Sequence, residues 1–282
     1  RKELLLRYNS EPKPKATLIS WYLSNLNGAN FDWQGRMQNW FVNVTQGLSF
    51  KHRTNFGYGF DGGYERVFEF EFGPNRTATR PGAFFGPDPE RSTHRKTFFV
   101  FGDTTPSKKF SAAAVITYSF GTLDFDLGAG PRFPRVSPAA LLNPRAALDP
   151  GPGNALDISA NLTFQPTDAL RASLDYTKSR LVRHDTGLVA FDANIYSLRG
   201  TYQFTRFTFA RARLDIDSLA SRLRGQYLLG WTPNPGTSFY VGYNDDMTHD
   251  GFNPFTSQLE RGFRRNGRTF FIKFSYLFRR SL

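Results

Sequence analysis

Arginine occurs on the polar positions of three consecutive segments of the chain, at alternate residues in two of them, and this pattern is the one most suited to chemistry. The arginines in this pattern are Arg199, Arg211, Arg213, Arg222 and Arg224. Alternate residues of a β-strand share one face, so on neighbouring strands these guanidiniums would form a basic stripe. On the wall of a water-filled channel, such a stripe can select anions or acidic solutes.

Aspartates follow the same alternation and support a second interpretation. The polar faces of the same segments and their neighbours carry Asp157, Asp175, Asp215 and Asp217. Opposite charges on adjacent strands attract, so these carboxylates could neutralise the arginines and stabilise the channel wall. We call such a series of ion pairs across neighbouring strands a charge ladder. The pattern favours the ladder and leaves anion selection open.

Other chemistry has little support in the sequence. Glu65, Glu69 and Glu71 could bind Ca²⁺, but an ordinary solvated face explains them more simply. The histidines fall at expected turns or loops without metal-ligand spacing; they are His52, His94, His184 and His249. Cysteine is absent, which excludes thiol catalysis, and no Gly-x-Ser-x-Gly sequence occurs. We therefore expect no enzyme activity, no metal and no cofactor.

The arginines must be held by strands, because the chain alternates apolar and polar residues. In 156–165 every even-numbered residue is apolar and every odd-numbered one is polar. This period predicts about twelve antiparallel strands. They are expected at 15–24, 36–50, 54–72, 94–103, 108–130, 156–165, 169–183, 192–205, 207–217, 221–231, 237–246 and 268–278. A phase change near Gly121 predicts a bulge.

Links of alternating length join these strands. Short turns are expected at 51–53, 104–107, 166–168, 205–206 and 232–236, and longer links at 25–35, 73–93, 131–155, 184–191 and 247–267. The short link at 218–220 breaks the rule, and 131–155 is expected to be irregular. Short turns at one end and long loops at the other are typical of outer-membrane barrels.

Aromatic residues near strand ends favour a membrane barrel over a soluble β-sandwich or barrel, which alternation alone would also fit. The expected membrane girdle comprises Tyr118, Phe120, Tyr176, Tyr202, Trp231, Tyr276 and Phe278. Such residues favour the membrane interface. The predicted fold class is an all-β, antiparallel transmembrane β-barrel. It would have fourteen or more strands if upstream strands belong to it. Residues 1–14 would be an N-terminal segment, with an extra strand possible at 3–9, and 15–282 the barrel.

Composition limits the alternatives. Aromatic residues make up 16% of the chain, which excludes a disordered protein. The net charge of +12 is scattered over alternate strand positions, so we expect no nucleic-acid partner. The chain begins at Arg1 without a visible signal peptide, which we interpret as a mature chain or a fragment.

Two segments carry a resemblance to a known family. Residues 224–245 contain RGQYLLGWTPNPGT followed by SFYVGYND, and 268–279 contain RTFFIKFSYLFR. Together they resemble the C-terminal outer-membrane-like β-barrel region of a bacterial family of unknown function. Its members carry an N-terminal carbohydrate-binding module of the family 9 type, which is absent from this chain. The resemblance is clearest over 160–280.

The last expected strand also resembles the C-terminal recognition signal of outer-membrane proteins. Its apolar face comprises Phe270, Ile272, Phe274, Tyr276 and Phe278. Four residues follow Phe278, which departs from the strictest form of the signal. This resemblance implies the barrel-assembly machinery as a partner and the outer membrane of a Gram-negative cell as the location.

The sequence is compatible with three functions. The first is a porin-like transport barrel, acting as a pore or translocation channel. The second is a membrane anchor that holds a carbohydrate-binding domain, a partner protein or a surface glycan at the cell surface. The least supported is a soluble carbohydrate-binding β-domain. The first two require outer-membrane lipid around the apolar strand faces.

Overall fold

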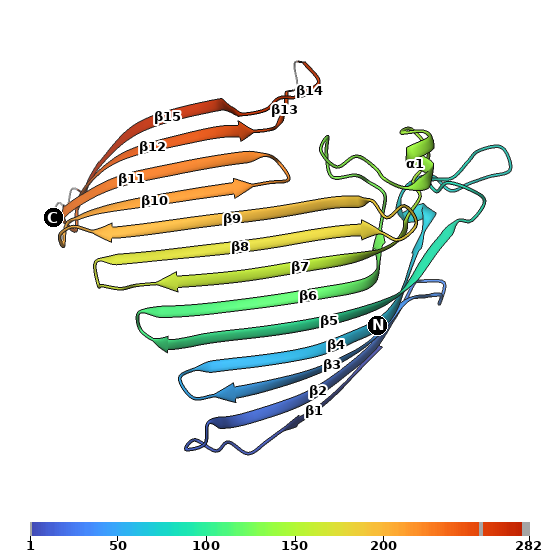
Figure 1. The fold of residues 1–282 in the computed structure, drawn as a ribbon, viewed down its shortest axis with the longest axis horizontal. Helices are drawn as coiled ribbons and strands as arrows, with labels where there is room; N and C mark the ends of the chain where they lie inside the picture. Colours follow the sequence, from blue (N-terminus) through green and yellow to red (C-terminus); the bar gives the residue numbers. More distant parts are fainter. Residues whose placement is uncertain (1, 254–255, 278–282) are drawn as a thin grey trace, which may run out of the picture. The chain divides into compact units, whose positions relative to one another are not determined.

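The computed structural model describes residues 2–253 and 256–277. Thirteen strands form one antiparallel sheet in chain order, except that β15 follows β12 (Figure 1). Its first strands are β1 (Lys2–Asn9), β2 (Leu18–Phe31), β3 (Met37–Phe50), β4 (Thr54–Phe68), β5 (Glu90–Ser107), β6 (Phe110–Asp124) and β7 (Gly151–Phe164). They are followed by β8 (Leu170–Arg183), β9 (Val189–Gln203), β10 (Thr208–Asp217), β11 (Arg222–Asn234), β12 (Thr237–His249) and β15 (Phe263–Tyr276).

Smaller elements lie in the links. The one-turn 3-10 helix η1 (Glu69–Glu71) follows β4, and α1 (Pro138–Leu142) lies between β6 and β7. The short strands β13 (Phe252–Asn253) and β14 (Gln258–Leu259) pair between β12 and β15. Among the described residues, neither helix has the length or apolar character to span a membrane.

The chain divides into two compact units, which are described separately. The first comprises Arg1–Thr104, Ala114–Ile158 and Lys178–Asp192. The second comprises Thr105–Ala113, Ser159–Thr177 and Ala193–Leu282. The second unit therefore holds most of β9 and all of β10, β11, β12 and β15.

The predicted all-β antiparallel fold is confirmed, and several expected boundaries are wrong. The long link expected at 25–35 is only 32–36, because β2 continues to Phe31 and pairs with β1 and β3 on its two sides. Pairing on both sides thus overrides the low strand propensity of Asn25, Asn27 and Gly28. Residues 3–9, for which an extra strand was left open, lie in β1.

Two expected short turns lie inside strands instead. Residues 104–107 belong to the end of β5, and the turn is at 108–109. Likewise β11 continues to Asn234, and the turn is Pro235–Gly236. The turn at 51–53 is confirmed: His52 and Arg53 have φ of 61° and 51°, as a tight hairpin turn of this kind needs.

The expected strand 108–130 ends early, at Asp124. Gly121 has φ of +72°, and its carbonyl accepts a hydrogen bond of 2.8 Å from Thr93 Oγ1. The left-handed conformation suits glycine and accounts for the phase change in the sequence. The 131–155 segment is partly ordered, since α1 lies in it and Ser137 Oγ caps that helix by accepting the Ala140 amide at 3.0 Å.

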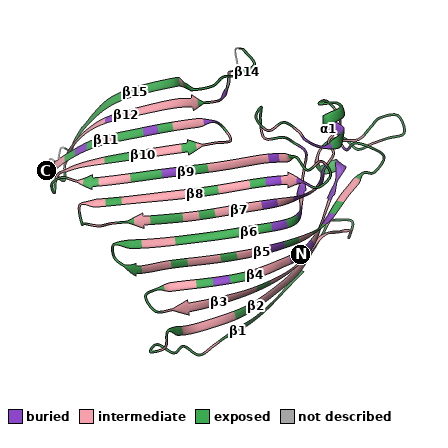
Figure 2. Cartoon of the chain, viewed as in Figure 1, coloured by how far each residue is buried: buried purple, intermediate pink, exposed green. Residues whose placement is uncertain are grey.

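Burial is concentrated in the first unit (Figure 2). One cluster contains Val67, Phe84 and Leu123, and another contains Val136, Ala155, Leu181 and Ala190. In the described part of the second unit no apolar side chain is buried. Its apolar strand faces thus have no protein layer over them, whereas a soluble sandwich would pack them as its core.

Candidate functional site

Strand registers in the second unit align polar side chains in rows across the sheet. Arg213 of β10 lies directly opposite Arg199 of β9 and Gln226 of β11. Gln226 lies opposite Asn244 of β12, which lies opposite Thr269 of β15. Directly opposite residues of an antiparallel pair project to the same face. These five residues therefore form one polar row.

A groove of about 460 Å³ lies along this row. Its polar-face residues are Arg199, Thr201, Arg211, Arg213, Gln226, Leu228, Asn244 and Phe271. The hairpin between β9 and β10 brings Arg199 next to Arg213, as the sequence predicted, and pairs Arg211 with Thr201. Guanidinium, amide and hydroxyl donors thus converge in this groove, which we call the basic groove.

Carboxylates neutralise two of its arginines. Arg199 Nη1 lies 3.4 Å from Asp175 Oδ2. Arg213 Nε lies 2.8 Å from Asp215 Oδ2, and the other oxygen of Asp215 accepts a 2.6 Å hydrogen bond from Ser197 Oγ. The charge-ladder interpretation thus describes Arg199 and Arg213.

The arginines of β11 have a partner that the sequence reasoning missed. Arg222 Nε donates to Asp246 Oδ1 at 2.8 Å, and Arg224 lies directly opposite Asp246 in the register. The expected strand 237–246 ended at this residue, and its alternation places Asp246 on the face of Asn244. That shared parity was the signal that could have identified Asp246 as a partner.

The other two predicted acidic partners have different roles. Asp217 accepts hydrogen bonds from the amides of Leu219 at 2.9 Å and Ala220 at 3.0 Å, so it caps the turn after β10. Asp157, in the first unit, accepts a 2.5 Å hydrogen bond from Ser179 Oγ. Neither forms an ion pair with a stripe arginine among the described residues.

Arg211 differs from Arg199 and Arg213. Within the described residues it forms no ion pair with a carboxylate, and its side chain is exposed. Its guanidinium carbon lies 4.7 Å from the centre of the Phe209 ring, a cation–π contact that leaves the charge in place. Arg211 is therefore the arginine of the basic groove that is available to an anion.

The aromatic residues expected at strand ends do not all lie there. Tyr202, Trp231 and Tyr276 lie near the short turns of the second unit and are about half exposed. Tyr118 and Phe120 lie toward the other end of β6, with ring centres 4.8 Å apart. Tyr176 lies in the middle of β8, so it does not mark a strand end. Their relation to a membrane stays a prediction.

The last strand keeps the alternation of the expected C-terminal signal. Phe270, Ile272, Phe274 and Tyr276 share one face of β15, and all four are exposed. Phe278 lies outside the described residues.

Loops of the first unit are held by buried charges, and two expectations fail there. Glu69 is not on a solvated face, since only 3% of its side chain is exposed and Arg76 Nη2 lies 2.7 Å away. The hydrogen bond from Arg76 lowers the pKa of Glu69 to about 2, although burial of the carboxylate raises that pKa.

His94 was expected in a loop, but it lies inside β5, opposite Tyr64. The described residues contain no group of three carboxylates or histidines arranged for a metal.

Comparisons with known proteins gave matches among solved structures alone. No family model and no curated protein matches the chain. Among solved structures, the copper transporter OprC matches with a TM-score of 0.51 and 13% identity, over 91% of this chain and 44% of that chain. A FadL homologue from Pseudomonas aeruginosa matches with a TM-score of 0.29 and 14% identity, over 94% and 74%. The monoaromatic hydrocarbon channel CymD matches with a TM-score of 0.28 and 10% identity, over 87% and 82%.

The likeness to OprC is one of fold. The chain spans less than half the length of that transporter. With the single antiparallel sheet and its exposed apolar faces, the fold class is that of the outer-membrane β-barrels.

Proposed function

We propose that this chain forms part of the wall of a β-barrel in the outer membrane of a Gram-negative bacterium. The barrel acts as a pore or translocation channel for anionic solutes. One observation carries the proposal. In β9, β10 and β11 of the second unit, charged side chains lie on one face and exposed apolar side chains on the other, and no apolar side chain is buried among the described residues of that unit. A membrane barrel needs this arrangement, because lipid covers one face and water the other.

The solute class follows from the basic groove. Its donors are guanidinium, amide and hydroxyl groups, and Arg211 has no carboxylate partner among the described residues. Arginine pairs with carboxylates and phosphates through paired N–H donors. The groove therefore suits small carboxylates or phosphates better than cations. The likeness in fold to the transporter OprC supports a transport role in general and does not bear on the solute class.

Ion selectivity tests the proposal. The purified protein is inserted into planar lipid bilayers, and the reversal potential is measured in a KCl gradient. We expect conductance with preference for Cl⁻, and a reduced preference in Arg211→Gln. The control is Arg145→Gln, which removes the same charge from an exposed position of a first-unit loop. Silence over many insertions, or equal selectivity in both variants, would refute the proposal.

An anchor is the second candidate, and the ordered loops of the first unit favour it. Phe84 and Leu148 form a parallel bridge between the two long loops, and Arg91 Nη2 lies 3.7 Å from Asp149 Oδ1. Such ordered loops are a surface on which a partner protein or a surface glycan could be held. The anchor predicts no conductance, and co-purification of a partner from native membranes.

We also propose that the chain is the barrel region of the family that residues 224–245 and 268–279 resemble. The barrel-assembly machinery would then recognise β15. Heat-modifiable migration on a gel after expression with and without the C-terminal residues 270–282 tests this step. Equal insertion of both forms would contradict it.

A further inference from the structure

The apolar face of the second unit carries a cluster of charges in the halves of β12 and β15 that adjoin the link 250–262. Asp245 of β12 lies directly opposite Gly225 of β11 and Arg268 of β15. Gly225 lies opposite Leu214, so Asp245 and Arg268 share the face of the apolar residues. The register shifts between Asp246 and Met247, and Arg265 then lies opposite Met247 on that same face.

These side chains contact one another closely. Arg265 Nε lies 3.0 Å from Asp245 Oδ1, and Tyr243 Oη donates to Asp245 Oδ2 at 3.0 Å. The Arg268 guanidinium carbon lies 5.8 Å from the centre of the Tyr243 ring. One carboxylate thus faces two guanidiniums, and the cluster keeps a net positive charge. Arg265 donates to Asp245 through Nε at 3.0 Å and through Nη2 at 3.4 Å, and its side chain remains 47% exposed.

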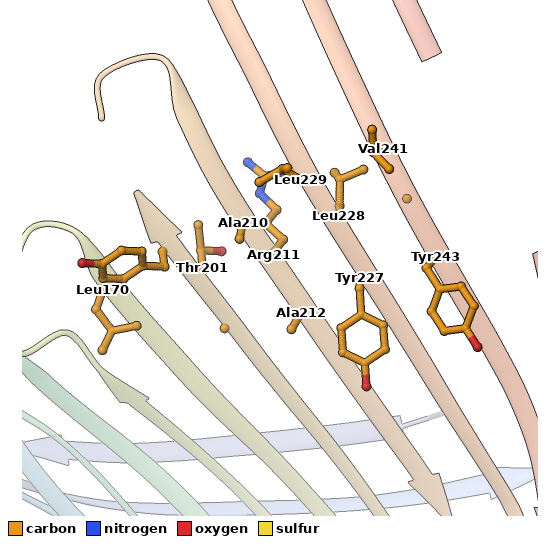
Figure 3. Close-up of a pocket in the computed structure, with 13 residues that line it drawn as sticks. Leu170, Thr201, Ala210, Arg211, Ala212, Tyr227, Leu228, Leu229, Val241 and Tyr243 are labelled. Atoms are coloured by element: carbon orange, nitrogen blue, oxygen red, sulfur yellow. The ribbon is translucent and has the colours of Figure 1, made fainter. Parts of the chain in front are cut away.

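Tyr243, which donates to Asp245 in this cluster, also lines an apolar groove of about 500 Å³, which is drawn in Figure 3. Gly200, Ala210 and Ala212 form its floor, because their side chains are too small to fill the space between the neighbouring large residues. Leu170 lies on one side of the two alanines, and the rings of Tyr227 and Tyr243 lie on the other. Tyr243 belongs to both features, so the apolar groove and the charged cluster are continuous.

We propose that this surface binds a phosphorylated lipid, with an acyl chain in the apolar groove and the phosphate at Arg265 and Arg268. The inference rests on the proposed function, which places this face in lipid. Charge complementarity supports it: arginine donors suit phosphate oxygens, and an arginine facing lipid costs least near the interface, toward which Arg265 lies as the third residue of β15. The groove volume is within the range of ligand sites.

Lipid retention tests the proposal. The full chain, purified in detergent, is incubated with phosphatidylglycerol or phosphatidylcholine of the same chain length, and bound lipid is counted by native mass spectrometry. We expect preference for phosphatidylglycerol. Arg265→Gln and Arg268→Gln should each lower that preference about fivefold, which corresponds to ~1 kcal/mol for one cation at an anionic lipid surface.

Two further variants separate the parts of the site. Lys273→Gln removes a cation from the opposite face of the same strand, since Lys273 lies opposite Tyr240, and should leave the preference unchanged. Ala212→Leu narrows the groove and should reduce retention of both lipids. Equal binding of the two lipids by the wild type, or wild-type preference in both arginine variants, would overturn the proposal. Full displacement of the lipid by inorganic phosphate would show a phosphate site instead.

Insertion into phosphatidylcholine vesicles, followed by heat-modifiable migration, is measured in parallel for every variant. A chain that inserts but does not discriminate between the lipids overturns this inference alone. A chain that does not insert overturns the proposed function as well.

Discussion

An arginine placed on each face of β11 tests which face lies in lipid. Leu229 lies one residue from the middle of this strand, opposite Ala210 and Val241 on the apolar face. Gln226 projects from the other face, opposite Arg213 and Asn244. Leu229→Arg and Gln226→Arg therefore introduce the same side chain into one strand, three residues apart, in different surroundings.

The expected costs differ several-fold. The 13 residues of β11 rise ~3.3 Å each, so at a tilt of about 45° they cross roughly 30 Å, the thickness of a bilayer core. Leu229 then lies near mid-bilayer, where an arginine facing lipid costs about 2–4 kcal/mol. In water the same change would cost about 0.5 kcal/mol or less, because 49% of Leu229 is exposed. Gln226→Arg should cost under about 1 kcal/mol, from repulsion by Arg213.

Equilibrium unfolding provides the measurement. Each variant is refolded into phosphatidylcholine vesicles and unfolded in guanidinium chloride, with tryptophan fluorescence as the probe. The free energy of unfolding should fall by about 2–4 kcal/mol for Leu229→Arg and much less for Gln226→Arg. Equal losses in the two variants, or a Leu229→Arg variant within ~0.5 kcal/mol of the wild type, would refute the assignment of faces.

Three other predictions follow from single contacts. Glu69→Gln should speed amide hydrogen exchange at Arg76, because a buried ion pair that loses one partner costs about 3–5 kcal/mol. The pKa of Glu69 is about 2 in the folded protein and near 4.5 in the unfolded protein. The difference in exchange rate between Glu69→Gln and wild type should therefore be largest above pH ~4.5 and shrink as the pH falls toward 2. A difference in exchange rate that does not depend on pH would contradict this. Gly242→Ala should destabilise by about 1–3 kcal/mol, because a Cβ there would lie 2.1 Å from Phe271 Cζ. Phe271→Leu in the same chain should recover part of that loss in a double-mutant cycle, and strict additivity would argue against the clash. Asp246→Asn should increase Cl⁻ preference in bilayers by releasing the β11 arginines, and unchanged selectivity would place that pair outside the ion path.

The fold class was predictable because alternation is a local property. A period of two places Leu229 and Gln226 on opposite faces whatever the rest of the chain does. The same rule put Arg199 and Arg213 on one face, and their tight hairpin put them on neighbouring strands. Strand ends were less predictable, since 25–31 forms a strand only through ladders on both sides.

The partners of each charge required the tertiary structure. The alternation of β12 gives only the face on which Asp246 lies, and the register of β11 with β12 brings it to Arg222. Arg76 meets Glu69 because a long loop folds back on the end of β4, although the sequence had indicated a solvated face for Glu69.

By itself, the sequence determined which residues alternate, and therefore which side chains share a face of each strand. Only the tertiary structure decided which charges are paired and which remain available. It also decided that the register shift after Asp246 turns Arg265 onto the apolar face beside Asp245. The physical reason is that alternation depends on one strand's backbone, whereas pairing depends on the register between strands, which distant hydrogen bonds and bulges set.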